Sequence, residues 1–277
     1  MSELGRQKAN LLRELHHRGK PLVLPNIWDV ASARIVEEAG YEAIATTSAG
    51  IAFSLGYPDG QKISREEMLA RIARIARAVR VPVTADAEAG YGNRPEDAAE
   101  TARAVIEAGA VGMNLEDGTD DAEHPLVDLP LQLDKIRAVR EAALQSGVLL
   151  VLNARTDVYL AQVGAPEMRY SETMKRALAY RDAGADCIFV PGLSDPETIR
   201  QLVQEVKCPV NILAGLGSPS VPELQGLGVA RISLGSGPMR AALGLVKKLA
   251  EELRKTGTYG ALEGAPPHGD VNKMLEK

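Results

Sequence analysis

Acidic side chains stand where two apolar runs in the middle of the chain end. Asp86 and Glu88 follow the run Pro82–Ala85, and Glu116 follows the run Gly112–Leu115. Alternate side chains of a strand point to the same face, so Asp86 and Glu88 are expected to share a face. Neighbouring strands lie about 4.8 Å apart, so Glu116 is expected to join them in one cluster.

Three packed carboxylates are unfavourable unless something compensates their charge. They repel one another, so either some stay protonated or a cation lies among them. A site of oxygen ligands alone, without His or Cys, suits Mg²⁺ or Mn²⁺. The sequence therefore predicts a divalent metal site formed by Asp86, Glu88 and Glu116. The alternative is that these acids cap helices or pair with arginines on a solvated rim, because surface Asp and Glu are common.

Two further segments offer groups that bind an acid. Arg155 carries a planar fork of donors that holds a carboxylate or phosphonate through two bonds. Its alternative role is an ion pair with Asp157 or with an acid of the cluster. The small residues Ser48, Ala49 and Gly50 offer backbone N–H groups to an anion, and the same residues are equally typical of a tight turn.

These residues need a framework that brings strand ends together, and the chain alternates helical and strand patterns. The phrases Glu38–Gly40, Glu107–Gly109 and Asp182–Gly184 each end a helix and precede an apolar run. Apolar strands alternating with helices are typical of a parallel sheet, and eight such units favour a closed (β/α)8 barrel of the TIM type. The active site of such a barrel forms at the C-terminal ends of its strands. The expected strands are Leu22–Pro25, Ala43–Thr46, Pro82–Ala85, Gly112–Leu115, Leu149–Asn153, Cys187–Val190, Val210–Leu213 and Arg231–Leu234.

The chain has 277 residues, of which 45% are hydrophobic and 25% charged, as in a folded globular protein. No Pro-, Gly- or Ser-rich linker interrupts the pattern, so residues 1–277 are predicted to be one barrel domain. Helical residues from Ser2 to His17 are expected to cap the barrel's lower mouth or its side. The tail from about Gly264 is expected to be an irregular arm.

Charge and hydropathy exclude some partners. The formal net charge of −5 gives no basic field, which argues against nucleic acid and anionic membranes as partners. No stretch of about eighteen apolar residues and no secretory signal pattern occurs, so a cytoplasmic location is expected. Cys187 and Cys208 have no metal-binding spacing and are interpreted as small core residues.

Several motifs match a known family in order and position. The segment Asp86–Gly92 is similar to a D-x-D-x-G-Y-G metal-binding motif, with Glu88 in place of the second Asp. From about Pro25 to Arg240 the chain resembles the isocitrate lyase/phosphoenolpyruvate mutase superfamily. The other matching segments are Pro25–Asp29, Thr47–Gly50, Leu55–Asp59, Leu115–Asp117 and Asn153–Asp157.

The resemblance implies a Mg²⁺-dependent enzyme that binds a small 2-oxo carboxylic acid and stabilises an enolate-like species. Asp86, Glu88 and Glu116 would hold the ion directly or through water, with Asp59 assisting. It also implies a barrel whose last helix is exchanged with a neighbouring subunit, in a homodimer or homotetramer.

The same resemblance assigns the acid-binding groups. Arg155 and the amides of Ser48–Gly50 would hold the substrate carboxylate. Trp28 would line the pocket, although a lone Trp is equally a core residue. Asn211 resembles the superfamily's asparagine after the seventh strand, in a shifted context, and is a further substrate-binding candidate.

The chain also departs from the superfamily pattern. Superfamily lyases carry a Lys-Lys-Cys-Gly-His type loop for proton transfer, whereas Gly118–Pro125 contains neither Lys nor Cys. A Glu expected after the sixth strand is absent from Val190–Gly192. His124 could supply the acid or base, and it is otherwise a surface loop histidine.

These departures argue against isocitrate lyase itself, because retro-aldol cleavage needs both an acid and a base. The first hypothesis is a carbon-carbon lyase that acts by oxaloacetate-type decarboxylation or by 2-methylisocitrate-lyase-like cleavage with a variant acid. The alternatives are a phosphonopyruvate-type mutase or hydrolase, and a non-catalytic 2-oxo acid-binding protein. The segment Gly118–Leu129 distinguishes them: folded over the site with His124 or an acid inward it favours catalysis.

Overall fold

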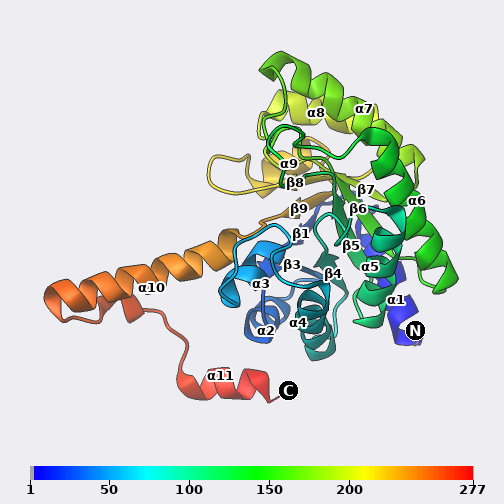
Figure 1. Cartoon of the computed structure of the whole chain (residues 1–277). Helices are drawn as coiled ribbons and strands as arrows, with labels where there is room; N and C mark the ends of the chain where they lie inside the picture. The colour runs from blue at the N-terminus through cyan, green and yellow to red at the C-terminus, as the bar shows by residue number, and fades with distance from the viewer. Residues whose placement is uncertain (1–2, 277) are drawn as a thin grey trace.

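The computed structural model describes residues 3–276 as a barrel of parallel strands surrounded by helices (Figure 1). The predicted α/β barrel is thereby confirmed. Neighbouring strands pair in the order β1-β9-β8-β7-β6-β5-β4-β3-β2. The strands are β1 (Leu22–Leu24), β2 (Asn26–Ile27), β3 (Ile44–Thr46), β4 (Val83–Asp86), β5 (Gly112–Glu116), β6 (Val151–Arg155), β7 (Cys187–Phe189), β8 (Val210–Leu213) and β9 (Arg231–Ser233).

The first barrel strand is broken at Pro25 into β1, which pairs with β9, and β2, which pairs with β3. Proline has no N–H to give to a ladder, which explains the break. The Asn26 side chain spans it: Oδ1 accepts from the N–H groups of Leu234 at 2.8 Å and Gly235 at 2.9 Å. Its Nδ2 donates to the Thr46 carbonyl at 2.8 Å. One side chain therefore closes the wall where backbone pairing stops.

Strands β4, β5 and β6 run further than the apolar runs predicted, and they end in charged residues. Their register sets Asp86 opposite Asn114 and Glu116 opposite Arg155. A backbone paired on both sides is rigid, so these side chains leave the barrel from fixed points. The strands thus fix the spacing of three of the predicted site residues.

The outer helices cover the strands, as the alternating pattern predicted. None of the helices among residues 3–276 is both long and apolar enough to cross a membrane. The helices are α1 (Glu3–Leu15), α2 (Val30–Glu38), α3 (Ser48–Ser54), α4 (Arg65–Ala78), α5 (Pro95–Glu107), α6 (Leu129–Gln145), α7 (Arg169–Asp182), α8 (Pro196–Val206), α9 (Val221–Gly226), α10 (Gly237–Thr256) and α11 (His268–Leu275), with short 3-10 turns at Pro166–Met168 and Gly260–Leu262.

Helix α1 packs against the strands through its apolar face. Leu12 is fully buried, and a Cβ placed on Gly112 of β5 would lie 2.8 Å from Leu12 Cδ2. A Cβ at this position would also lie 2.8 Å from Thr84 Oγ1, so glycine leaves room for both side chains. Near the end of α1, the buried His16 holds the Leu12 carbonyl through Nδ1 at 2.7 Å.

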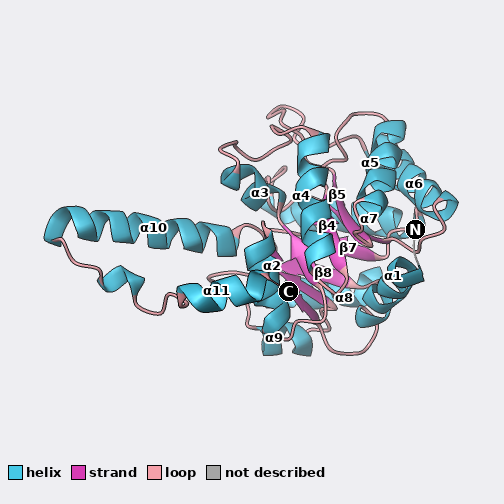
Figure 2. Ribbon diagram, turned by 90° about the horizontal axis from the view of Figure 1, so that it is seen from below, coloured by secondary structure: helices cyan, strands magenta, loops and turns pink. Residues whose placement is uncertain are grey.

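The C-terminal part of the chain leaves the barrel and returns to it. Helix α10 projects outward, and α11 lies back against α2 (Figures 1 and 2). The expectation of an irregular arm from Gly264 is therefore wrong for residues 268–275. Pro267 occupies the N-cap of α11 and Met274 is buried, so a short amphipathic pattern that sequence reasoning passed over packs as a helix.

Candidate functional site

Asp86 is the last residue of β4, and it is held by neighbours on both sides. Its Oδ2 accepts from the Ser48 N–H at 2.9 Å and the Ser48 hydroxyl at 2.8 Å, and its Oδ1 accepts from Asn114 Nδ2 at 3.0 Å. The Asp86 N–H donates to the Thr46 hydroxyl at 2.9 Å. Three donors on one buried carboxylate fix its orientation and stabilise its charge.

Glu88 lies just beyond the end of β4, in a left-handed conformation with φ of 50°. Strand alternation therefore does not apply to it, which differs from the shared face expected with Asp86. Its carboxylate accepts from the Gln61 N–H and, at 3.1 Å, from the Tyr91 hydroxyl. Burial, followed by the nearby Asp86 charge, raises the Glu88 pKa to about 7. The side chain thus resists ionisation where it stands.

Glu116 and Arg155 face each other at the ends of β5 and β6. Glu116 Oε2 lies 2.6 Å from Arg155 Nη1, and Asp157 holds the other edge of the guanidinium, with Oδ1 2.6 Å from Nε and Oδ2 2.9 Å from Nη2. The guanidinium carbon lies 5.8 Å from the centre of the Phe189 ring. Burial raises the pKa of Glu116 despite Arg155, and the Asp157 and Asp86 charges act in the same direction.

Arg155 is thus in both of the ion pairs that sequence reasoning offered as its alternative role. A guanidinium has five N–H groups in a fixed fork. Its Nε and Nη2 donate to Asp157, and its Nη1 forms an ion pair with Glu116 Oε2. Nη1 and Nη2 each carry a second N–H group. The ion pairs therefore hold the Arg155 guanidinium between two acids, and its binding of a substrate acid stays a prediction.

The predicted metal ligands do not already form a complete coordination sphere. Among residues 3–276, no group of three or more His, Cys, Asp and Glu side chains is arranged to hold a metal ion by itself. Asp86 and Glu88 nevertheless are buried carboxylates, and within that part of the chain no Lys, Arg or His forms an ion pair with either. An all-oxygen set with unmatched negative charge fits a partly hydrated Mg²⁺, so the metal site stays a prediction.

Asp59 and the Ser48–Gly50 segment lie beside Asp86. Partial desolvation, then the Asp86 charge, raises the pKa of Asp59, on the turn that follows α3. Ser48–Gly50 is the first turn of α3, where a tight turn was the alternative expected: its Ser48 N–H donates to Asp86, and its Gly50 N–H donates to the Thr47 hydroxyl at 3.3 Å. Two of the three amides expected to bind an anion are thus engaged within the protein.

The remaining candidates, Trp28, Asn211 and His124, differ in burial and in their contacts. Trp28 is half-buried and packs on the core, and a Cβ on Gly50 would lie 3.2 Å from its Cβ. Asn211 is fully buried inside the barrel, where its amide bonds the Ser233 hydroxyl at 3.2 Å. The His124 side chain is 80% exposed and pairs with Asp121 at 3.2 Å. The structure therefore does not bring His124 to the carboxylates.

The loop after β5 is held to its neighbours at both sides. Gly118 pairs with Leu126 in an isolated bridge, and Asp120 forms an ion pair with Lys62 at 2.7 Å. A cavity of about 680 Å³ lies between this loop and residues 161–164, and Asp157 contributes to its wall. The loop thus bridges toward the turn that carries Asp59, although His124 points outward.

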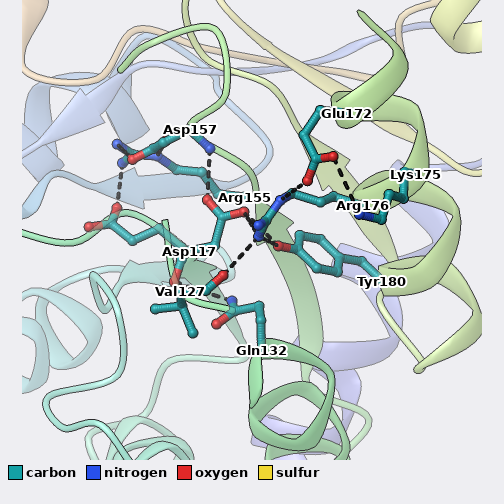
Figure 3. Close-up of polar contacts among 10 residues, drawn as sticks. Asp117, Val127, Gln132, Arg155, Asp157, Glu172, Lys175, Arg176 and Tyr180 are labelled. Atoms are coloured by element: carbon teal, nitrogen blue, oxygen red, sulfur yellow. Dashed lines mark hydrogen bonds and ion pairs between the residues drawn. The ribbon is translucent and has the colours of Figure 1, made fainter. Parts of the chain in front are cut away.

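Sequence reasoning missed several residues that support the site. Tyr91 binds Glu88, and Asn153 Nδ2 donates to Asn114 Oδ1 at 2.8 Å, in line with Asp86. Arg176 and Tyr180 of α7 donate hydrogen bonds to Asp117 (Figure 3). The spacing of Glu88 and Tyr91 was a local signal that could have been used. Nothing in the sequence separates Arg176 and Tyr180 from other residues of an amphipathic helix.

Replacing Glu88 with glutamine is expected to remove a pH dependence of stability in the metal-free protein. Its pKa is about 7 in the folded state against 4.5 ordinarily, so between these pH values the folded state keeps a proton that the unfolded chain has lost. The free energy of unfolding should therefore fall as pH rises from 4.5 through 7, by up to about 3 kcal/mol. Denaturant unfolding in EDTA from pH 4.5 to 8 measures this.

Glu141→Gln, on the exposed face of α6, is the control, and it should keep the wild-type slope. Mg²⁺ should raise wild-type stability more at pH 8 than at pH 5.5, because ion binding requires the ionised carboxylates. An identical pH slope in wild type and Glu88→Gln would contradict the assignment.

The fold and the site together define a parallel α/β barrel with carboxylates and an arginine at the C-terminal ends of adjacent strands. The family model described as phosphoenolpyruvate phosphomutase matches residues 12–254. The chain therefore belongs to this family, and the expected membership of the PEP mutase/isocitrate lyase superfamily is confirmed.

Similar proteins span several activities. Oxaloacetate decarboxylase 2 of Pseudomonas fluorescens is 28% identical over 85% of this chain and 80% of its own length. The 2-methylisocitrate lyase of Escherichia coli is 30% identical over 86% and 81%. A candidate lyase/mutase from Burkholderia cenocepacia has a crystal structure with TM-score 0.94 and 40% identity, covering 100% of this chain and 98% of its own. A phosphonopyruvate hydrolase in complex with oxalate and Mg²⁺ has TM-score 0.84 and 25% identity, covering 97% and 94%.

Proposed function

We propose that this protein is a Mg²⁺-dependent carbon-carbon lyase that acts on a small 2-oxo acid through an enolate-like species. The observation that supports this best is that buried acids and an arginine lie together at the C-terminal ends of the barrel strands. Within residues 3–276, Asp86 and Glu88 are buried acids that form no ion pair with Lys, Arg or His, and at the end of β6 Arg155 carries N–H groups beyond the two that bind Asp157. A divalent ion and an anionic substrate complement these two halves.

The residues have distinct roles in this proposal. Arg155 binds and orients the substrate carboxylate. Asp86, fixed by Ser48 and Asn114, would hold the ion together with Glu88 and Glu116, in part through water. The ion, when bound, would polarise the 2-oxo group and stabilise charge on the enolate oxygen. Trp28 and Asn211 remain proposed as substrate-binding residues.

Decarboxylation is the reaction that needs least from the protein. Loss of CO₂ from an oxaloacetate-type acid requires orientation of the carboxylate and stabilisation of the enolate, whereas retro-aldol cleavage also needs positioned acid and base groups. The loop Gly118–Pro125 has no Lys or Cys, and its His124 points to solvent. An oxaloacetate decarboxylase among the relatives supports the same choice. The phosphonopyruvate-type mutase or hydrolase is the alternative within the fold.

A panel of three acids tests the proposal on the full chain with Mg²⁺. Oxaloacetate should give pyruvate and CO₂ above the rate of Mg²⁺ alone, and EDTA should abolish it. 2-Methylisocitrate would give pyruvate and succinate, and phosphonopyruvate would give pyruvate and phosphate or phosphoenolpyruvate. Absence of product from all three, with Mg²⁺-dependent binding of oxalate retained, would favour the non-catalytic binding protein over the lyase.

We further propose that α10 is exchanged between subunits of a homodimer or homotetramer. Within residues 3–276 of a single chain, Met239 is the only residue of this 20-residue helix that is buried. The exposed apolar side chains of α10 are Leu243, Leu245, Val246 and Leu253, which are 44–63% accessible. A helix with an uncovered apolar stripe is an expected interface.

The double substitution Leu245→Glu with Val246→Glu is expected to convert the oligomer to a monomer, because two new charges would lie in the apolar contact. Light scattering after size exclusion measures the mass. Lys248→Glu changes the net charge by the same amount on the same helix, and it should leave the oligomer intact. A wild-type protein that elutes as a monomer would contradict the exchange.

A further inference from the structure

Asp117 is a fully buried acid next to Glu116, and it contacts β6 and its loop in two ways. Its backbone N–H donates to the Arg155 carbonyl at 3.2 Å, and its Oδ1 accepts from the Asp157 N–H at 2.8 Å. The Asp157 carboxylate in turn accepts hydrogen bonds from Nε and Nη2 of Arg155. Asp117 thereby fixes the position of the residue that orients the guanidinium.

Two residues of the outer helix α7 donate hydrogen bonds to the Asp117 carboxylate (Figure 3). Its Oδ2 accepts from the Tyr180 hydroxyl at 2.6 Å and from Arg176 Nη1 at 3.0 Å. Tyr180 is fully buried, and Arg176 is 7% exposed. A continuous series of hydrogen bonds therefore runs from the outer helix through Asp117 and Asp157 to Arg155.

Arg176 also fixes the loop that follows β5. Its Nη1 donates to the Val127 carbonyl at 3.0 Å, while the Val127 N–H donates to the Asp117 carbonyl at 2.8 Å. At the other end of the loop, a Cβ on Gly118 would lie 2.5 Å from Asp157 Oδ2. Both ends of the loop are thus packed on the same acids that set Arg155.

A role in stability alone does not account for this arrangement. Taking an ion pair out of water costs about as much as its attraction returns, and well-packed apolar residues often serve a core equally well. Here the charged groups lie between a helix and the strand ends that carry the candidate site. These charged groups can hold the Arg155 guanidinium in one orientation, which matters because a two-bond contact with a carboxylate tolerates little misplacement.

We propose that Asp117, Arg176 and Tyr180 are positioning residues that set the orientation of Arg155 through Asp157. This rests on the proposed function, in which Arg155 binds the carboxylate of a 2-oxo acid. Loosening the series should weaken binding of the acid without changing the binding of the ion. A planar dicarboxylate such as oxalate is a suitable probe, because it offers a carboxylate to Arg155 and oxygens to Mg²⁺.

Tyr180→Phe tests the proposal with the least disturbance, since it removes one hydroxyl and keeps the ring. Calorimetry should show oxalate binding with Mg²⁺ weakened about tenfold and the Kd for Mg²⁺ alone unchanged. Tyr170→Phe is the matched control: it lies on the same helix, and its hydroxyl donates to Glu205 at 3.0 Å on the surface. It should bind oxalate as wild type does. Arg176→Lys should retain more affinity than Arg176→Met, because it keeps a donor.

A second measurement is independent of any ligand. The Arg155 Nε–H donates to Asp157, so its ¹H–¹⁵N signal, assigned with Arg155→Lys, reports the orientation directly. In Tyr180→Phe this signal should move toward that of a free arginine and exchange faster with water. An unchanged signal and unchanged oxalate affinity would overturn the positioning role. Absence of oxalate binding in wild type, with the signal still moved by Tyr180→Phe, would instead overturn the proposed function and leave the orientation of Arg155 by α7 established.

Discussion

Asp86→Asn is expected to abolish Mg²⁺-dependent turnover, lowering kcat/KM about 1000-fold. The substitution removes the charge of the proposed ligand while keeping its shape, and Lewis-acid stabilisation is worth several kcal/mol in the transition state. The Asn114 amide and the Ser48 groups all donate to Asp86, so an amide NH₂ at position 86 also meets donors. We expect a loss of about 1–3 kcal/mol in stability from that mismatch.

Mg²⁺ titration by calorimetry, alongside steady-state rates, checks this expectation. Asp134→Asn is the control, because that residue pairs with Arg137 on the surface of α6 and should leave both quantities unchanged. Wild-type affinity for Mg²⁺ in Asp86→Asn would remove Asp86 from the metal site. Lost turnover with unchanged Mg²⁺ binding would give Asp86 a different role from the one proposed.

Arg155→Lys is expected to raise KM for the 2-oxo acid about 100-fold, with a smaller change in kcat. Lysine keeps the charge that Glu116 and Asp157 require but loses the planar fork that holds a carboxylate through two bonds. Two charge-assisted hydrogen bonds to the ligand account for a loss of this size. Removal of the charge, as in Arg155→Met, should also destabilise the fold by about 3–5 kcal/mol, because it leaves two buried acids unpaired.

Initial rates across a wide range of acid concentrations separate KM from kcat in Arg155→Lys. Arg200→Lys, which replaces an exposed arginine paired with Glu197, provides the reference for a surface change of the same kind. An unaltered KM would contradict the role of Arg155 in binding the carboxylate.

The barrel was predictable because its signals repeat. Three Asp/Glu-Ala-Gly phrases each end a helix before an apolar strand, and eight alternating strand-helix units leave few other topologies. Asp86, Glu116 and Arg155 were predictable for a related reason: they end strands, where alternation and sheet spacing fix positions. Residues in regular structure obey these rules, so their neighbours follow from the pattern.

The rest depended on contacts between distant segments. Glu88 takes a left-handed conformation after its strand, so the alternation rule does not apply to it, although it stays near Asp86. Tyr180 reaches Asp117 across 63 positions of sequence, and no local pattern encodes that meeting. Helix α11 was missed because its amphipathic pattern covers only eight residues, too few turns to stand out, and the helix packs against α2.

The side chain of Asn26 has a consequence for the direction in which the longest helix leaves the barrel. Its Oδ1 holds the two amides just before α10, 208 and 209 positions further along the chain, while its Nδ2 is tied to the strand below Ser48. A change in the direction of α10 would break both hydrogen bonds and leave the two N–H groups without an acceptor, at a cost of about 1–3 kcal/mol each. The direction in which α10 leaves the barrel is thus set in part by Asn26, a residue near the start of the chain.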